Sequence, residues 1–463
     1  MDHKYKALAK DTFVFFLGKF GSRMVLFFLV PLYTNCLSKP EYGTADLVFT
    51  LSQLLVAVFS IVIYDSVVRF GLMKGAKKEN VLRNAFVVLG FCVLMTLIAT
   101  PFFSLHKGIS PWKIHLSILI VLAATMDIEM NYLKVINKNL SYSIISIIQS
   151  VVLASSNILF LLVLSAGING YLMSTILAYA CCVVIAFFAG HIYRDLRASE
   201  FDKDLLKQML LFSSPLILNS VSWWVIQSSD KFMVEAMLSA TALGLYTAAS
   251  KIPSLINVIV TVFQQSWGIS SIKEIETTDS TDFYSSVLKV FSTGVFVCCI
   301  LLNLVVKPFM RIYVGAEFTE AWKYVPLLVA SAGFSAVSAY YGALYSALKK
   351  SINNMITTFS AAIVNVIINV IFIQVCGVWG AIIGTVTSYV LISYLRMFDI
   401  SRYVKMDYDI PRFITNTLIV LAQAITVSLD IYPIMSSFVY LTLFFFVNIS
   451  VMKKLVKFKK SKK

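Results

Sequence analysis

Three basic residues lie deep inside strongly apolar segments of the sequence. Lys19 and Arg23 are four residues apart, so they share one face if the first apolar segment is a helix. At about 1.5 Å per residue, Arg23 lies about 16 Å from one end of its segment and Lys251 about 17 Å from one end of another. Charged side chains at such depth in a membrane normally face a cavity or a partner. These three cations are candidates for binding an anionic group, although Lys19 could instead extend to the membrane surface.

Acidic residues in similar segments form a second set of candidates. Asp65 and Arg69 are spaced i, i+4, which also fits a simple structural ion pair. Asp127 and Glu129 point to different faces of their helix and are candidates for binding a coupling cation or proton, with solvation at the membrane interface as the alternative. Asp230 is either a cavity residue or the partner of a cation on another helix.

The sequence predicts no metal site and no catalytic residue. Its seven cysteines lie in or beside apolar stretches without a CxxC spacing, and its four histidines are scattered. We therefore expect no cofactor, except that H⁺ or Na⁺ could act as a coupling ion.

The composition requires that lipid surround the elements that carry these residues. Of the 463 residues, 59% are hydrophobic and only 14% are charged, with a mean hydropathy of +0.82. Soluble domains contain about 25% charged residues. This excludes a soluble enzyme, a secreted disulfide scaffold and a nucleic-acid-binding protein. The net charge of +15 then reflects where the loops lie.

The apolar segments predict an all-α polytopic membrane protein with about 14 transmembrane helices, or 12 with a differently arranged tail. Either count is even, so both termini lie on one side. The predicted spans are 12–37, 43–68, 84–105, 112–133, 141–164, 169–190, 208–236, 240–265, 284–305, 323–347, 354–375, 378–396, 412–428 and 432–451.

The distribution of basic residues orients these spans. With a cytoplasmic amino terminus, the inner segments contain 28 of the 39 lysines and arginines and the outer segments contain 6. The positive-inside rule therefore places both termini in the cytoplasm. The longest connections have about 17 residues, which leaves no room for an extramembrane catalytic domain.

The two halves of the chain repeat each other in the same order. Because each unit holds six spans, the two units have the same orientation, which is typical of transporters with a parallel repeat. We predict a six-helix bundle over residues 1–195, a second over 196–403, and two further helices with a basic tail over 404–463. The repeated landmarks are Leu37-Ser38 with Leu238-Ser239, Pro101-Phe102 with Pro308-Phe309, Trp112-Lys113 with Trp322-Lys323, Asn157 with Asn369, and Gly167, Gly170 and Thr175 with Gly377, Gly380 and Thr385.

These motifs resemble the Wzx-type polysaccharide flippases, which move O-antigen or capsule repeat units and belong to the multidrug/oligosaccharidyl-lipid/polysaccharide (MOP) exporter superfamily. The resemblance covers nearly the whole chain and does not specify the sugar. It rests on FFLGKFGSRMVLFFLVPLYTNCLSKPEYG, IVIYDSVVRF, SSDKFMVEAMLSATALGLYTAASKIPSL and GVWGAIIGT.

The resemblance implies two six-helix bundles around a central cationic cavity. It implies transport of undecaprenyl-diphosphate-linked oligosaccharide from the inner to the outer leaflet of the bacterial cytoplasmic membrane, by ion-coupled alternating access. The protein would then be no enzyme, and its partners would include a polysaccharide polymerase and a chain-length regulator. Lys19, Arg23 and Lys251 fall where diphosphate-binding cations are expected, and Asp65, Arg69 and Asp230 fall in motifs like those of the family.

Three alternatives stay open. A MATE-like drug/cation antiporter of the same superfamily would favour an acidic lumen, against which the three deep cations argue. A lipid II or sporulation-type flippase would share the same chemistry. A membrane-embedded enzyme of polysaccharide assembly is disfavoured by the short loops and the repeat.

Overall fold

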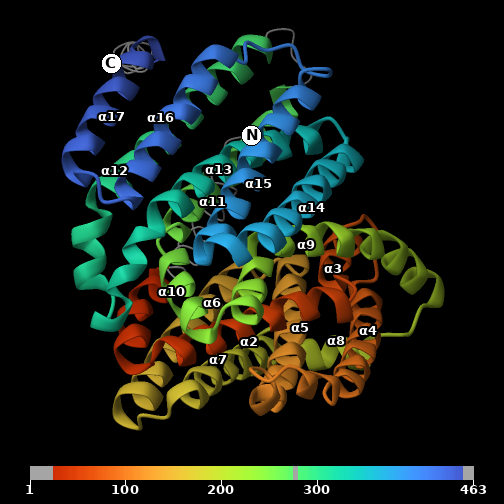
Figure 1. The fold of residues 1–463 in the computed structure, drawn as a ribbon. Helices are drawn as coiled ribbons and strands as arrows, with labels where there is room; N and C mark the ends of the chain where they lie inside the picture. Colours follow the sequence, from red (N-terminus) through yellow and green to blue (C-terminus); the bar gives the residue numbers. More distant parts are fainter. Residues whose placement is uncertain (1–23, 275–279, 452–463) are drawn as a thin grey trace. The chain divides into compact units, whose positions relative to one another are not determined.

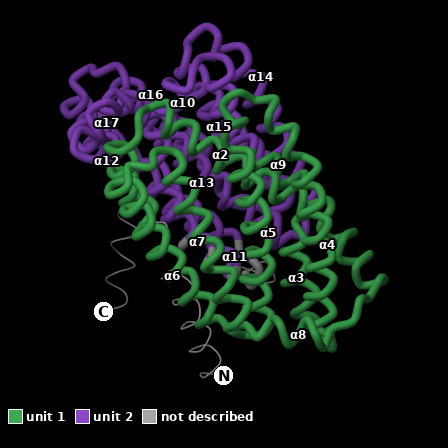
Figure 2. The backbone as a smooth tube through the Cα atoms, turned by 90° about the horizontal axis from the view of Figure 1, so that it is seen from below, with its two compact units in different colours: residues 1–224 green, residues 225–463 purple. Residues whose placement is uncertain are grey.

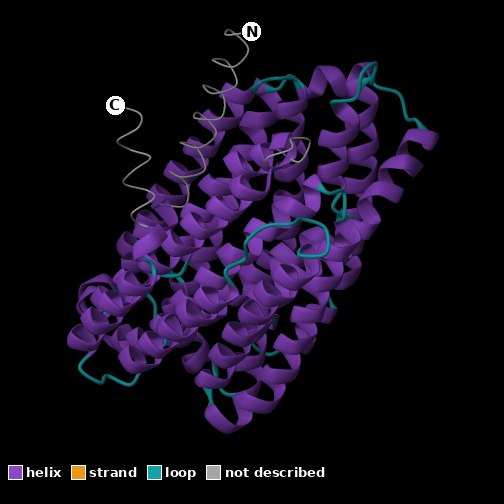
Figure 3. Ribbon diagram, turned by 90° about the horizontal axis from the view of Figure 1, so that it is seen from above, coloured by secondary structure: helices purple, strands orange, loops and turns teal. Residues whose placement is uncertain are grey.

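The computed structural model describes residues 24–274 and 280–451, and this part of the chain is helical with no β-strand (Figure 3). It forms two compact units, Met1–Trp224 and Val225–Lys463 (Figure 2). The domain limits predicted at 195 and 403 stay predictions, and the all-α fold class is confirmed.

Unit 1 is organised around α5 (Figure 1). Helix α5 packs against α2, α3, α4, α6 and α7, and α6 packs mainly on α7. The elements of this unit are the helix Met24–Cys36, α2 (Lys39–Phe59), α3 (Ile63–Gly71), α4 (Lys78–Ala99), the 3₁₀ turns Phe102–Leu105 and Ser110–Trp112, α5 (Lys113–Val135), α6 (Asn139–Asn157) with a π-helical turn Ile158–Val163, α7 (Gly167–Ala189), α8 (Ile192–Ala198) and the first part of α9 (Lys203–Met237).

Unit 2 is organised around α13, which packs against α11, α12, α15 and α16. Helix α14 packs on α15, and α17 packs against α12 and α16. After the end of α9, the elements are α10 (Ala240–Ser250), α11 (Ser254–Glu274), α12 (Ser280–Tyr313), the 3₁₀ helix Ala316–Lys323, α13 (Val325–Ala347), α14 (Ser351–Cys376), α15 (Val378–Ile400), α16 (Ile410–Ser428) and α17 (Pro433–Val447).

Length and hydropathy identify this chain as a multi-pass membrane protein. Eleven described helices are long and apolar enough to cross a membrane, and the bent pair α10–α11 makes twelve. The shorter apolar helices Met24–Cys36 and Pro433–Val447 lie where the first and last spans are predicted. Large apolar side chains such as Phe446 and Val375, each more than three quarters exposed, cover the helix surfaces. Lipid, and not water, is the solvent that suits such surfaces. The exact count of fourteen stays a prediction.

Two spans that we predicted as continuous are broken. Residues 43–68 divide into α2 and α3, because Ile61 and Val62 both adopt left-handed backbone angles. The sequence did not reveal this break, since β-branched residues rarely adopt positive φ. Residues 240–265 divide into α10 and α11 with a bend of 40°. Pro253 has no amide hydrogen to continue the helical hydrogen bonds there.

Two pairs of residues from the predicted repeat occupy similar local positions in the two units, and the repeat itself stays a prediction. Ser38 caps the start of α2 and Ser239 caps the start of α10. Gly167 and Gly377 have φ of +56° and +61° at the starts of α7 and α15. Glycine adopts such angles without the steric penalty of a Cβ atom.

Candidate functional site

Asp230 is a buried carboxylate held by hydrogen bonds in unit 2. Only 1% of the residue is exposed. Its oxygens accept hydrogen bonds from the Tyr246 hydroxyl on α10, from Thr385 Oγ1 on α15 at 2.9 Å, and from the backbone amide of Lys231 at 3.0 Å. No described Lys or Arg side chain forms an ion pair with Asp230. The sequence left two interpretations of Asp230, a cavity residue or the partner of a cation on another helix. The described part of the structure shows no such cation.

Ser229, which precedes Asp230 on α9, contacts a pair of polar side chains on α14. Ser229 Oγ and Asn369 Nδ2 both donate to Asn365 Oδ1, each at 3.1 Å. Asn365 and Asn369 are fully buried, and Asn365 Nδ2 and Asn369 Oδ1 lack hydrogen-bond partners in the described part of the chain. A Cβ atom at Gly384 would lie 2.0 Å from Asn369 Oδ1, so glycine is required for this close approach.

This arrangement combines a carboxylate with hydroxyl and amide oxygens, which are ligands suited to a proton or a hard cation. It lacks the soft ligands of a transition-metal site. Consistent with this, no group of three or more His, Cys, Asp or Glu side chains occurs in the described ranges.

Lys251 lies at the bend between α10 and α11 and is half-buried. Its carbonyl oxygen accepts hydrogen bonds from the amide of Ser254 at 3.2 Å and from Ser254 Oγ at 2.5 Å. These bonds, with Pro253, fix the turn that carries the lysine. The other two predicted cations, Lys19 and Arg23, lie outside the described residues.

In unit 1, the predicted pair Asp65 and Arg69 does not form. Both residues are exposed on α3, and the Arg69 guanidinium lies 4.7 Å from the centre of the Phe212 ring. An i, i+4 spacing permits an ion pair but does not require it, because an aromatic face competes for the guanidinium.

The two acids on α5 lie in different surroundings, as their spacing predicts. Asp127 is half-buried and lies within electrostatic range of Asp65 and Lys134. Lys134 itself donates to Asn131 Oδ1 at 2.7 Å and lies over the Tyr142 ring. Glu129 is buried, with 1% of the residue exposed. It forms no hydrogen bond or ion pair with Asp127, Asp65 or Lys134.

Comparison with known proteins decides the family. The family described as "Polysaccharide biosynthesis protein" matches residues 8–267, which is more than half of the chain. The chain belongs to this family. A curated relative, "Lsg locus putative protein 1" of Haemophilus influenzae, is 21% identical over 262 residues, covering 54% of this chain and 62% of the relative. The chain therefore matches about three fifths of that relative's length.

Solved structures show that this polysaccharide biosynthesis family member has the fold of MOP-superfamily transporters. It is similar to "Lipid II flippase MurJ, inward closed conformation" with a TM-score of 0.73 and 15% identity, covering 96% of this chain and 99% of that one. It is also similar to an inward-facing "multidrug resistance MATE family transporter of the MOP superfamily", with a TM-score of 0.65, 14% identity, and coverage of 83% and 94%.

The family member contains two buried charged residues that our sequence analysis did not single out. Asp46 on α2 is 2% exposed, and an acid in the middle of an apolar segment is the same signal that identified Asp230. Arg396 on α15 is 1% exposed, and its nitrogens donate to Asn354 Oδ1 at 2.5 Å, Thr358 Oγ1 at 2.8 Å and the Ser338 carbonyl at 2.9 Å. Its place near the end of a predicted span made it look like an ordinary inner-surface charge.

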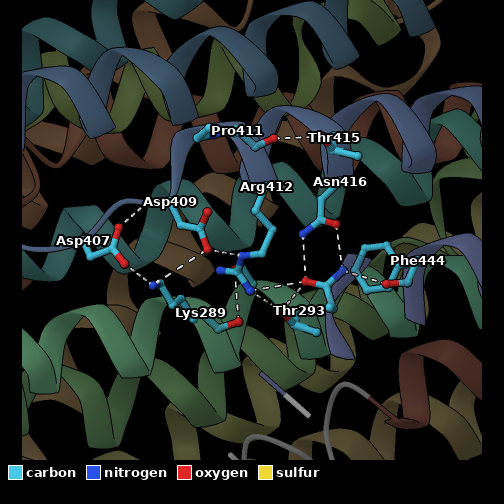
Figure 4. Close-up of polar contacts among 11 residues, drawn as sticks. Lys289, Thr293, Asp407, Asp409, Pro411, Arg412, Thr415, Asn416 and Phe444 are labelled. Atoms are coloured by element: carbon cyan, nitrogen blue, oxygen red, sulfur yellow. Dashed lines mark hydrogen bonds and ion pairs between the residues drawn. The ribbon is translucent and has the colours of Figure 1, made fainter. Parts of the chain in front are cut away.

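In unit 2, a polar cluster joins α12 to the connection before α16 (Figure 4). Lys289 forms an ion pair with Asp407 and lies 3.8 Å from Asp409, whose Oδ2 lies 2.9 Å from Arg412 Nε. Asn448, just after α17, hydrogen-bonds with Asn416 on α16. These contacts hold α16 and α17, the two C-terminal helices, against α12.

Asp430, in the turn between α16 and α17, makes a further ion pair with Lys307 Nζ at 2.5 Å. Between the two ends of the hairpin, Asn303 on α12 donates to Gln423 on α16 at 3.0 Å, and Gln423 donates to Ser437 on α17 at 3.0 Å. The last two helices are therefore integral parts of unit 2.

Proposed function

We propose that this protein moves undecaprenyl-diphosphate-linked oligosaccharide repeat units from the inner to the outer leaflet of the bacterial cytoplasmic membrane. The observation that carries the proposal is membership of the polysaccharide biosynthesis family combined with a transporter fold. A solved structure with the same fold is named for flipping lipid II, which makes a lipid-linked cargo a natural choice. We further propose that both termini are cytoplasmic and that a polymerase and a chain-length regulator are partners.

Physical chemistry supports this cargo. A diphosphate carries about two negative charges and cannot cross hydrocarbon unaided, while its polyprenyl tail can stay in the lipid. The transporter must supply cations that replace part of the headgroup's hydration. We assign this role to Lys19, Arg23 and Lys251. The half-buried position of Lys251 at a helix bend suits a residue that meets a headgroup without being locked into the core.

The test of the cargo is export by variants of Arg23. Arg23→Ala should abolish surface polysaccharide while the amount of protein in the membrane stays unchanged. Arg23→Lys should keep part of the export, because a point charge still attracts a phosphate without the two-pronged geometry of arginine. Lys107→Ala, on a predicted outer loop, is the control and should export normally. Full export by Arg23→Ala would contradict the proposal.

We also propose that Asp230 binds the coupling ion. An inside-negative potential favours the outward movement of a negatively charged headgroup, by about 2.3 kcal/mol per charge per 100 mV across the full field. The empty transporter must then return to its starting conformation, and uptake of H⁺ or Na⁺ can drive this step. The oxygens around Asp230 support this assignment, and Asp65, Asp127 and Glu129 are the other acids that we considered.

Transport into proteoliposomes tests the coupling. A pH gradient, a sodium gradient and a membrane potential are imposed separately on the wild type, on Asp230→Asn and on a matched Asp127→Asn variant. Asp230→Asn should lose the response to one ion gradient, and Asp127→Asn should keep it. An unchanged response of Asp230→Asn to every gradient would mean that Asp230 only supports packing.

Two alternative functions have specific support. The similarity to MATE transporters, together with a buried acid in unit 2, supports a drug/cation antiporter. The similarity to MurJ supports a lipid II flippase. Drug efflux that rises with expression of this chain would favour the first, and rescue of a strain depleted of its lipid II flippase would favour the second.

A further inference from the structure

Glu129 occupies an apolar face of α5 in unit 1. Met126, Leu133 and Ile136 are three, four and seven residues away, so they share that face. They pack with Cys182 on α7 and Ile145 on α6 in one apolar cluster. Glu129 is itself 1% exposed, and its Oε2 has no hydrogen-bond partner among the described residues, so its carboxyl group is buried without polar contacts.

The carboxyl group of Glu129 has no charged partner in the described part of the chain. Its Oε2 accepts no hydrogen bond there, and no described Lys, Arg or His lies within ion-pair distance. The titratable group that faces it is the Cys182 thiol on α7. Asp127, on the same helix, also lies within electrostatic range of Cys182, as well as of Asp65 on α3 and Lys134. Tyr142 on α6 lies at the edge of the cluster, beneath Lys134.

An ionised carboxylate in such surroundings would be far more costly than a neutral carboxylic acid. Asp230 shows the contrast, because three donors stabilise its carboxylate. We propose that Glu129 is a proton-binding site of unit 1, whose bound proton keeps α5, α6 and α7 packed together. Loss of the proton leaves a charge that needs water, so it loosens this interface.

This inference goes beyond the proposed function, since it depends neither on the cargo nor on Asp230. It assigns the ligand of this acid as H⁺ and not Na⁺, because Glu129 Oε2 has no hydrogen-bond partner among the described residues, whereas a metal ion needs several oxygen ligands at once.

Infrared spectroscopy of the purified protein in lipid tests the bound proton. At neutral pH, the wild type should show the C=O stretch of a protonated carboxyl group, and this band should shift in D₂O. Glu129→Gln should lose that band, whereas Asp127→Asn, two residues away on the same helix, should keep it. A spectrum of Glu129→Gln that retains the whole band would overturn the proposal.

Thermal unfolding in detergent gives a second, independent readout. If only the folded state binds this proton, the binding contributes less to the free energy of unfolding as pH rises. The melting temperature of the wild type should therefore fall relative to that of Glu129→Met as the pH is raised from 5 to 9. Methionine has a similar volume without the buried acid, so the variant should fold at least as well. A difference between the two melting temperatures that stays constant with pH, or that changes in favour of the wild type as pH rises, would overturn the proposal.

Discussion

At the scale of single residues, the buried polar groups of this protein differ in how completely they are paired. Asp230 accepts from three donors, and Arg396 donates to Ser338, Asn354 and Thr358. None of these three acceptors is a carboxylate, and the guanidinium also lies 5.9 Å from the centre of the Tyr345 ring. The planar, rigid guanidinium is what allows one cation to reach acceptors on two helices.

We predict that Arg396→Lys lowers the unfolding free energy by about 3 kcal/mol and is at least as damaging as Arg396→Met. Lysine keeps the buried charge but cannot reach the same acceptors, while methionine removes the charge. Unfolding measured in detergent micelles checks this order. A neutral effect of Arg396→Lys would show that the guanidinium geometry is unimportant.

Asp407 provides a pH-dependent contact outside the spans. The hydrogen bond from Lys289 holds the pKa of Asp407 below its ordinary value. A lowered pKa in the folded state means that the pair stabilises at neutral pH and that this stabilisation disappears as pH falls through the folded pKa. Asp407→Asn should melt slightly below the wild type at pH 7 and together with it at pH 2. The gap should also narrow in high salt, because the side chain is 66% exposed.

The sequence singled out candidate site residues but not the residues that contact them. Asp230 was found because an acid stands out in an apolar segment. Tyr246 and Thr385 follow it by 16 and 155 residues, and only the packing of α10 and α15 brings them to the carboxylate. The Asp65–Arg69 pair was wrong for a related reason, since Phe212 is supplied by a distant helix.

At the scale of elements, α16 and α17 form a hairpin joined to α12 along its length. Ion pairs lie at both ends of the hairpin, and Asn303, Gln423 and Ser437 connect the helices between them. Because lipid provides no hydrophobic drive between helices, such polar contacts and close packing hold a hairpin in place. The basic tail of the chain gave no hint of these contacts.

A double-mutant cycle should reveal the link between Asn303 and Gln423. Asn303→Leu and Gln423→Leu should each lower the unfolding free energy by about 1–2 kcal/mol, because each leaves a buried amide unpaired. The double variant should lose less than the sum of the two single losses. Additive losses would indicate that the two side chains act independently.

At the scale of the whole molecule, composition and the lengths of the apolar segments were enough to predict an all-α membrane protein, and the order of matching residues in the two halves predicted the repeat. Gly167 and Gly377 were recognised as equivalent from spacing alone, and both have positive φ. The break at Ile61 and Val62 was not predictable, because no glycine or proline marks it. The order of apolar segments can be read directly from a sequence. The strained backbone at Ile61 and Val62 depends instead on the packing of the folded chain.

The predicted topology can be checked with single cysteines introduced in a background without native cysteines. Lys77→Cys and Lys107→Cys lie just before and well after α4, so they should be on opposite sides of the membrane. An impermeant thiol reagent added to intact cells should label Lys107→Cys and not Lys77→Cys. Equal labelling from outside would overturn the assignment of the termini to the cytoplasm.

The two lysines that anchor the C-terminal hairpin also set a length. Lys289 and Lys307 are eighteen residues apart on α12, which is about 27 Å at the rise of an α-helix. That is close to the ~30 Å hydrocarbon thickness of a bilayer. A hairpin anchored by charges at both ends resists shortening or sliding when acyl chains change length. A mismatch with the bilayer is then met by a tilt of the helices or by a change in the thickness of the surrounding lipid.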